Sequence, residues 1–493
     1  MRTKNFIFLI LFLYTASAIG QTVKWERVYG GREYEYGRSV IQGLDSTYVV
    51  AGSSSSYNAA MDMYLICLKK DGSFKWHHAY GGGNDEWAYS VKQTPIDSGY
   101  ILCGFSNTWG NTGYDVYLVK TDKNGNMLWE RTYGGSDWDF GYSVDLTSDG
   151  GYILAGSTYS YGSGSEDAFL IKTDAAGNEQ WFNVYGGFSD DNFTEVHQIF
   201  GGGYVMSGRT KSFGAGDYDM WVVKTTPTSD IAWTYVYGSI YEDGLNSIKQ
   251  TPDSGFITVG YTFGNQGGTE SDNYILKLTS TGVVQGIPNN DLDPSKDSWM
   301  QSVWPNSDGT FFTVGYYKPV AGIDYSFNFA KWDPWLNYMA CCNSSRGGLE
   351  EEFAYSGQQT FDKGFIIAGN TNSWGNGKTD LYIVKLDSNF IYTNIAVVGL
   401  APEQTRTELE LFPNPASDRV YFEIEEGKLN GRIELKVLDV LGRELRSLSA
   451  GSAFTSHGMD RYAIPVADLE EGIYFLEISD DQNSFIGRII VKH

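Results

Sequence analysis

The sequence is poor in the residue types on which most catalytic and metal centres depend. Its 493 residues include only five histidines, four cysteines and 12 prolines. Neither a G-x-S-x-G nucleophile elbow nor an H-E-x-x-H zinc-binding pattern is present, and the glycine-rich segments have the composition of hairpin turns, not of phosphate loops. These absences exclude the common hydrolase, zinc-protease and nucleotide-binding motifs, and they make an enzyme the less favoured interpretation.

The few cysteines are not arranged to bind metal or to form a disulfide scaffold. They stand at Cys67, Cys103, Cys341 and Cys342. We expect them to be small buried residues. A disulfide between the adjacent Cys341 and Cys342 would be strained, and the redox state of this pair stays open.

Basic residues are also scarce. Thirty-six lysines and arginines stand against 60 aspartates and glutamates, which gives a formal net charge of −24. This charge repels nucleic-acid phosphates and anionic bilayers, so neither is an expected partner. It suits a soluble protein outside the cell, and it also attracts cations.

Long apolar runs are absent, and the longest, residues 6–14, is too short to span a bilayer. It follows Arg2 and Lys4 and precedes Ala16-Ser17-Ala18, which is the order of parts in a secretory signal peptide. We therefore expect residues 1–20 to direct export and to be removed.

Glycine (59 residues) and aromatic residues (15%) are abundant, and both recur along the chain with a period of about 52 residues. A segment of the type Tyr-Ile-Leu-Ala-Gly returns seven times, with its glycine at Gly52, Gly104, Gly156, Gly208, Gly260, Gly315 and Gly369. Each repeat holds four short β-type runs separated by turns rich in Asp, Asn and Gly. The sequence thus predicts an all-β fold, a seven-bladed β-propeller with four strands in each blade.

The two ends of the repeat region are complementary. The first repeat is preceded by an outermost type of strand at residues 23–29, whereas the last repeat ends near Asp387 without one. We predict that residues 23–29 complete the seventh blade, because this closes the ring and leaves no open sheet edge.

The repeats resemble those of bacterial secreted β-propeller proteins that carry Asp-Gly-Gly-Tyr-Ile and Tyr-Gly-Gly signatures, over about residues 22–395. The resemblance implies the fold. It implies no single activity, since propellers support binding, scaffolding and catalysis alike.

The composition changes after residue 398. A linker, residues 399–406, leads into residues 407–493, where alternating Leu435/Val437 and Ile473/Phe475 predict the strands of a small β-sandwich. The tail also contains a set of characteristic residues: Pro413, Asn414, Pro415, Gly442, Gly472, Tyr474 and Lys492. On these residues it resembles the type IX secretion sorting domain of Bacteroidota-type bacteria.

The resemblance implies that the type IX machinery is a partner of the tail. It further implies passage across the outer membrane and removal of the tail, which leaves the cargo on the cell surface or releases it. The chain is then divided into a signal peptide (1–20), a propeller (21–398), a linker (399–406) and a sorting domain (407–493). We expect the propeller to be monomeric.

Two sets of repeated residues are candidates for a site on one face of the propeller. An acid stands four residues before the repeated inner-strand position that is usually serine, and six of these acids form an acidic ring: Glu35, Glu86, Asp139, Asp191, Asp243 and Glu352. These carboxylates either accept hydrogen bonds from turn amides or pair with strand lysines such as Lys120, or they attract a cation such as Ca²⁺. For a bound metal, the candidates are Asp291 and Asp293 in an insertion between repeats.

Aromatic residues occupy the loop between the second and third strands, on the same predicted face. The six members are Tyr57, Trp109, Tyr161, Phe213, Phe263 and Trp374. They either hold the loops down by packing or present flat rings to a sugar, which offers an apolar face for stacking. A carbohydrate on a cell surface is the preferred ligand class, with a protein ligand as the alternative.

A third set varies between repeats at the position two residues after the usual serine. Asp145, His197 and Lys249 occupy it in consecutive repeats, so an acid, a base and a cation could converge in the central channel as in a polysaccharide lyase or hydrolase. The sequence therefore leaves three functions open: a binding protein, which we favour, an enzyme, or a ligand-free structural or adhesive surface protein.

Overall fold

The structure is a computed structural model of the chain. It describes residues 25–57, 60–110, 112–264, 270–286, 297–318, 324–341, 350–375, 377–388, 395–397, 407–408, 411–413, 416–425, 434–438, 444–449, 454–456, 459–469, 472–479 and 484–492. The chain divides into two compact units, residues 1–399 and 400–493, and each is described by itself. All elements in the described ranges are β-strands, and no membrane-spanning helix is found among them.

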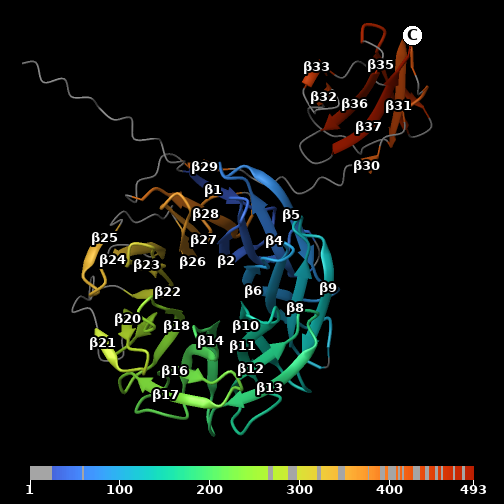
Figure 1. Ribbon diagram of the computed structural model, residues 1–493. Helices are drawn as coiled ribbons and strands as arrows, with labels where there is room; N and C mark the ends of the chain where they lie inside the picture. The colour runs from blue at the N-terminus through green and yellow to red at the C-terminus, as the bar shows by residue number, and fades with distance from the viewer. Residues whose placement is uncertain are drawn as a thin grey trace, which may run out of the picture. The chain divides into compact units, whose positions relative to one another are not determined.

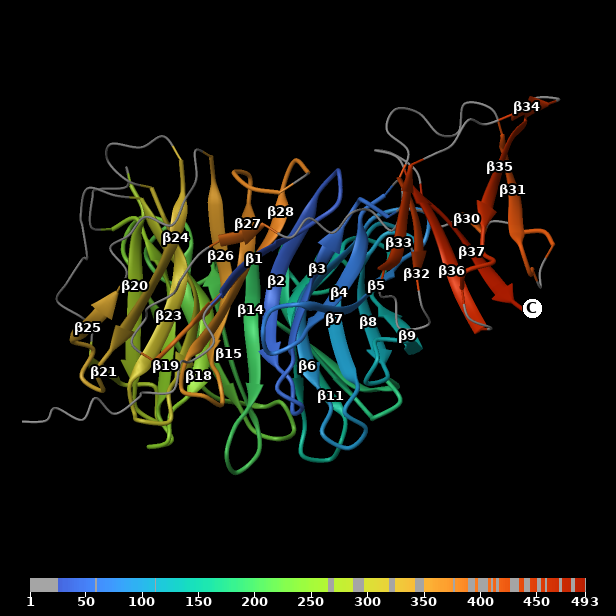
Figure 2. The ribbon, with the colours of Figure 1, turned by 90° about the horizontal axis from the view of Figure 1, so that it is seen from above.

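The first unit is the predicted seven-bladed propeller. Its blades are antiparallel sheets arranged in a ring, as Figure 1 shows along the axis and Figure 2 shows from the edge. The innermost strands surround the axis: β2 (Glu35–Gln42), β6 (Glu86–Gln93), β10 (Asp139–Leu146), β14 (Asp191–Gln198), β18 (Asp243–Gln250), β22 (Ser298–Pro305) and β26 (Glu352–Gln359).

The two middle strands of each blade form its core. The second strands are β3 (Tyr48–Ser54), β7 (Tyr100–Ser106), β11 (Tyr152–Thr158), β15 (Tyr204–Thr210), β19 (Phe256–Thr262), β23 (Phe311–Tyr317) and β27 (Phe365–Thr371). The third strands are β4 (Asp62–Leu68), β8 (Asp115–Thr121), β12 (Asp167–Thr173), β16 (Asp219–Thr225), β20 (Asp272–Leu278), β24 (Ser326–Trp332) and β28 (Asp380–Leu386). Neighbouring blades cover both faces of these strands, which explains why the sequence shows apolar runs there and no strict alternation.

The outer strands complete the blades and close the ring. They are β5 (Phe74–Tyr80), β9 (Met127–Tyr133), β13 (Glu179–Tyr185), β17 (Ile231–Tyr237), β21 (Val284–Gly286), β25 (Tyr338–Cys341) and, in the seventh blade, β1 (Trp25–Tyr29). β1 pairs antiparallel with β28, and β29 (Ile395–Val397) adds to β1 in parallel. The prediction that the amino-terminal strand completes the last blade is confirmed.

Two of the four cysteines lie in the described part of the core. Cys67 and Cys103 are fully buried free thiols, as expected, and burial raises the pKa of Cys67 to about 11. The side chain of Cys341 and all of Cys342 lie outside the described residues.

Every innermost strand contains a β-bulge, and this bulge determines which residues face the axis. In β2, for example, the pairing with β3 shifts between Gly37 and Ser39, so Arg38 is the extra residue. The serine after the bulge links adjacent blades: the backbone N–H of Val91 donates to Ser39 Oγ at 3.3 Å, and that of Val40 donates to Ser356 Oγ at 3.1 Å. We call these equivalent residues the serine ring: Ser39, Ser90, Ser143, Ser247, Ser302 and Ser356, with Glu195 at the seventh place.

The second unit consists of two sheets. One contains β30 (Thr407–Glu408), β37 (Ser484–Val491), β36 (Gly472–Ser479), β32 (Glu434–Leu438) and β33 (Glu444–Ser449), and the other contains β31 (Arg419–Glu425), β35 (Met459–Pro465) and β34 (Phe454–Ser456). Their shared core includes Val420 and Phe422 from one sheet and Val437 and Leu476 from the other. The strands predicted at 435–437 and 473–475 are present as β32 and β36.

The residues that carry the sorting-domain resemblance lie at several places in this unit. Pro413 is exposed, Gly472 begins β36, Tyr474 packs against the core and Lys492 follows β37. Asn414, Pro415 and Gly442 lie outside the described residues.

Candidate binding site in the channel and at its mouth

The seven innermost strands enclose a cavity of about 390 Å³ on the propeller axis. This volume lies within the range of small-ligand pockets. The bulge residues of all seven strands line it: Arg38, Tyr89, Tyr142, Thr194, Asn246, Gln301 and Tyr355. The repeat thus delivers one variable side chain from each blade to a common cavity.

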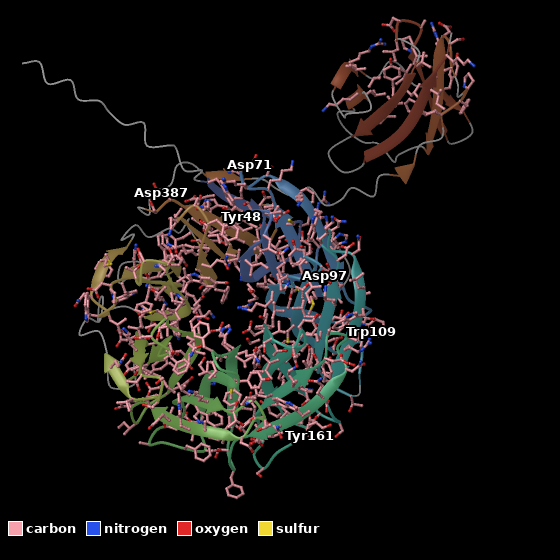
Figure 3. All side chains as sticks on the ribbon, viewed as in Figure 1. Tyr48, Asp71, Asp97, Trp109, Tyr161 and Asp387 are labelled. Carbon is pink, nitrogen blue, oxygen red and sulfur yellow. The ribbon has the colours of Figure 1, made fainter. Side chains whose placement is uncertain are left out.

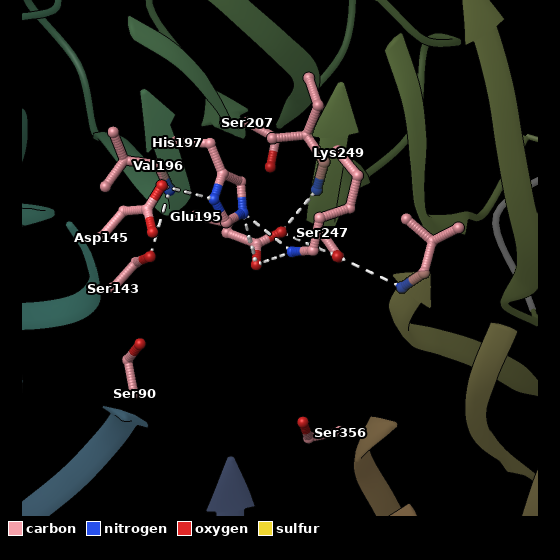
Figure 4. Close-up of polar contacts among 12 residues, drawn as sticks. Ser90, Ser143, Asp145, Glu195, Val196, His197, Ser207, Ser247, Lys249 and Ser356 are labelled. Carbon is pink, nitrogen blue, oxygen red and sulfur yellow. Dashed lines mark hydrogen bonds and ion pairs between the residues drawn. The ribbon is translucent and has the colours of Figure 1, made fainter. Parts of the chain in front are cut away.

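Charged side chains from three consecutive blades meet on one side of the channel (Figure 4). His197 Nδ1 lies 3.0 Å from Asp145 Oδ2, and His197 Nε2 lies 2.8 Å from Lys249 Nζ and 3.1 Å from Glu195 Oε1. Lys249 also forms an ion pair with Glu195. The convergence of Asp145, His197 and Lys249 that the sequence suggested is confirmed.

Glu195 is the centre of this network and was not identified from the sequence. Its carboxylate accepts hydrogen bonds from Ser247 Oγ at 2.8 Å and from the backbone N–H of Ile248 at 2.7 Å. Burial acts to raise the pKa of Glu195, but the charge of Lys249 and the contacts of His197 outweigh it and hold the pKa well below its usual value. The charge of the buried Glu195 carboxylate is compensated by Lys249, and His197 contacts the same carboxylate.

Aromatic side chains crowd the end of the channel where the loops between blades lie. One arc comes from blades one to three and a second from blades six and seven, and within each arc ring centroids lie 4.8 to 6.3 Å apart. We call both arcs together the aromatic rim: Tyr36, Trp87, Tyr89, Phe105, Tyr114, Trp138, Phe140, Tyr142, Tyr159, Trp299, Tyr316, Tyr325, Phe353 and Tyr355. Trp138 is 50% exposed and Tyr159 is 40% exposed, so the rim offers ring surface to solvent.

Arg38 joins the two arcs. Its guanidinium carbon lies 4.0 Å from the ring centroid of Tyr355, 5.5 Å from that of Tyr89 and 5.9 Å from that of Tyr36. These are cation–π distances, and they keep a positive charge in the cavity wall.

A polar group fills the remaining part of the mouth, on blades three to five. Arg209 Nη1 lies 3.2 Å from Glu242 Oε1 and donates to the Tyr261 hydroxyl at 3.3 Å. Tyr218 stacks on the same guanidinium at 4.2 Å. Burial raises the pKa of nearby Glu166, which lines the cavity.

The side chains of the predicted acidic ring accept hydrogen bonds from backbone and hydroxyl groups of the protein. All six acids are buried, and most accept a hydrogen bond from the turn that precedes them: Gly31 N–H donates to Glu35 at 2.9 Å, and Gly82 N–H donates to Glu86 at 2.9 Å. The suggested pairing with strand lysines is wrong. Those lysines turn to the opposite face, where Lys120 pairs with Asp97 at 2.7 Å.

The six loop aromatics do not share one environment. Phe263 stands three residues after Gly260, the place that Tyr159 holds after Gly156, and packs on Tyr261 of the cavity wall at 6.1 Å. Tyr57 stacks on Tyr64 of the third strand at 5.6 Å, and Trp374 packs on Tyr382 of the third strand at 5.3 Å. Figure 3 shows Trp109 and Tyr161 towards the outer edge of the ring. The structure therefore places all of them except Phe263 in an outer set on the same face and does not gather the six into one pocket.

The described part of the chain shows no group of three or more His, Cys, Asp or Glu side chains that could hold a metal ion. The candidates Asp291 and Asp293 lie outside the described residues. A Ca²⁺ site at the insertion stays a prediction.

Comparisons with known proteins agree with the two-part organisation. Residues 410–492 match the family described as the secretion system C-terminal sorting domain, and residues 45–74 match the family described as a domain of unknown function (DUF5122) beta-propeller. The chain therefore carries a type IX sorting tail, and the protein is secreted by that route to the cell surface or beyond it.

Similarity to individual proteins is limited to a short segment or to the fold. The regulatory protein FlaEY of Caulobacter vibrioides is 33% identical over 111 residues, which make up 20% of this chain and only 12% of that protein. The Pan2 WD40 domain of Neurospora crassa is 10% identical with a TM-score of 0.43, covering 71% of this chain and 88% of that one. Sqt1 of Chaetomium thermophilum is 11% identical with a TM-score of 0.44, covering 82% and 96%. Similarities at this level carry no argument about function.

Proposed function

We propose that this exported propeller is a carbohydrate-binding protein and that the sugar binds at the channel mouth. The observation that carries the proposal is the aromatic rim around an axial cavity, next to the polar group formed by Arg209, Glu242 and Tyr261. Stacked rings suit the apolar faces of sugars, and carboxylate and guanidinium groups suit their hydroxyls. Both kinds of group occur here within one site.

The outer loop aromatics extend the same face. Trp109 is 42% exposed and Tyr161 is 46% exposed. In our proposal they add secondary contacts for a long polysaccharide, while the rim makes the principal contacts.

Glycan-array binding of the chain from residue 21 onward tests the proposal. We expect Trp138→Ala and Tyr159→Ala to weaken binding at least tenfold, and Trp109→Ala to weaken it less. Trp335→Ala is the matched control, because Trp335 is 78% exposed and lies in the turn between β24 and β25, on the opposite face. Retention of full binding by both rim variants would contradict the proposal.

A second candidate function is polysaccharide cleavage in the channel. The contacts of His197 with Asp145, Glu195 and Lys249 favour it, since an imidazole held between carboxylates and a cation can transfer protons. Turnover of a polysaccharide that is lost in His197→Ala would support this function, and turnover that survives the substitution would exclude His197 as its base.

A further inference from the structure

The cavity differs in charge from the rest of the molecule. The chain has a net charge of −24, yet the charged residues that line the cavity are four basic ones, Arg38, Lys92, Arg209 and Lys249, and two acidic ones, Glu166 and Glu195. The cavity lining therefore carries two more basic than acidic side chains on an otherwise acidic protein. Such a local excess attracts an anion in spite of the overall charge.

Two of the four cations are already compensated. Lys249 is paired with Glu195, and Arg209 is paired with Glu242. Among the described residues, Arg38 and Lys92 form no ion pair within 4.0 Å, although the charge of Lys92 also acts on Asp145 and Glu195. Arg38 Nε is buried and has no hydrogen-bond partner there, and its guanidinium carbon lies 4.0 Å from the ring centroid of Tyr355 and 5.5 Å from that of Tyr89. A buried donor without an acceptor is unfavourable, so an entering acceptor is stabilised.

Building on the proposed carbohydrate function, we propose that the cavity receives the carboxylate of an acidic sugar, that is, a uronate residue of a polysaccharide. Arg38 binds the carboxylate through its planar fork of N–H groups, because a guanidinium matches a carboxylate in a bidentate manner. Lys92 lies on the inner strand of the adjacent blade and adds a second positive charge. Tyr89 and Tyr355 hold the guanidinium and offer ring edges to the sugar.

The test compares uronate polymers with their carboxyl-reduced counterparts. Polygalacturonate, alginate and hyaluronan are titrated into the chain from residue 21 onward, and each is repeated after chemical reduction of the carboxyls to neutral hydroxymethyl groups. We expect at least one uronate polymer to bind, its reduced form to bind at least tenfold more weakly, and added salt to weaken the binding.

Substitutions assign the effect to the cavity. Arg38→Gln is expected to lower the affinity for the uronate polymer at least tenfold, and Lys92→Gln to lower it less. Lys123→Gln, on an exposed turn, is the matched control and is expected to bind as the unmodified chain does. Melting curves of each variant confirm folding, and Lys92→Gln remains informative should Arg38→Gln not fold.

The outcomes separate this inference from the proposed function. Equal binding of charged and reduced polymers, or unchanged binding by both cavity variants, overturns the uronate inference and leaves carbohydrate binding intact. If no polymer binds in either form, the proposed function fails, and thermal shift with free galacturonate and galactose then decides the inference. A shift with galacturonate alone that is lost in Arg38→Gln supports it, and no such shift overturns it.

Discussion

His197 Nδ1 lies 3.0 Å from Asp145 Oδ2, and these two residues belong to the inner strands of adjacent blades. On its other side His197 Nε2 meets Lys249 Nζ from the next blade at 2.8 Å. His197 Nε2 also lies 3.1 Å from Glu195 Oε1, so the imidazole contacts a carboxylate on each side and the ammonium group of Lys249. Elsewhere around the channel, the residues of the serine ring link adjacent blades by neutral hydrogen bonds. Blades three to five are linked in addition by the charged side chains of this network.

Replacing Glu195 by the serine of the other blades should destabilise the propeller. Glu195→Ser keeps an acceptor for the N–H of Ile248 but leaves Lys249 largely buried without its carboxylate. We expect a loss of about 3 kcal/mol in the free energy of unfolding, measured by urea denaturation.

The double variant Glu195→Ser/Lys249→Ile is the control for this prediction. It removes both charges and uses the isoleucine that blade one carries as Ile41 at the equivalent place. Most of the lost stability should return. A double variant that is no more stable than Glu195→Ser would show that the ion pair is not the cause.

The channel network also predicts a pH dependence. Burial acts to raise the pKa of Asp145, but the charge and hydrogen bond of His197 outweigh it, and the pKa lies below its ordinary value, as does that of Glu195. A carboxyl whose pKa is lowered by folding stabilises the fold above its unfolded value and loses that contribution as the pH falls through the folded value. Stability should therefore decline from about pH 5 downward.

The variant Asp145→Asn measures how much of this pH-dependent stability comes from the carboxyl group of Asp145. We expect this variant to melt below the unmodified chain at pH 7, and the difference between them to shrink as the pH approaches 3. Melting curves across this range check the sign. A difference that stays constant or grows at low pH would contradict the assigned direction.

The fold was predictable because the same four-strand pattern recurs seven times along the chain, once for each blade. The closure by β1 followed from the same pattern, since one strand was missing at one end and extra at the other. Periodicity cannot show which side chains a bulge turns to the axis. Arg38 stands directly before the repeated serine, and the varying residues at this place in the other blades line the same cavity.

Glu195 illustrates the sequence signal from which the charged network in the channel could have been predicted. Six blades carry serine at its position and one carries glutamate, so a single departure within a repeated element marks the network. The six loop aromatics, in contrast, recur in nearly every blade, and recurrence is typical of scaffold packing. The outer position of Tyr57, Phe213 and Trp374, which pack on third strands, depends on the order of strands in the blade, and sequence spacing does not contain that order.

The repeated Tyr-Gly-Gly motif leads to a prediction about backbone space. A Cβ on Gly81 would lie 2.1 Å from Asp62 Oδ1 and 2.3 Å from Glu86 Oε2, and both carboxylates are fully buried. Gly81→Ala should therefore lower the free energy of unfolding by about 2 to 3 kcal/mol, measured by urea denaturation.

Gly83 gives a matched control in the same turn. Nothing lies within 4 Å of a Cβ built there, so Gly83→Ala should change stability by less than about 0.5 kcal/mol. Similar losses at both positions would mean that general loss of flexibility, and not the contact with the acids, explains the glycines.

Ring closure by β1 is the remaining prediction. Val28 and Tyr29 are fully buried, and Trp25 Nε1 donates to the carbonyl of Lys70 at 3.1 Å, so β1 joins the seventh blade to the first. A chain that starts at residue 31 loses these contacts and exposes the edge of β28. We expect its melting temperature to fall by about 10 °C or more relative to a chain that starts at residue 22, because the buried apolar area of β1 is lost.

The truncated chain should also aggregate at lower concentration, measured by light scattering. Equal melting temperatures for the two chains would show that the first and seventh blades hold together without the strand, and closure would then be a matter of packing between blades alone.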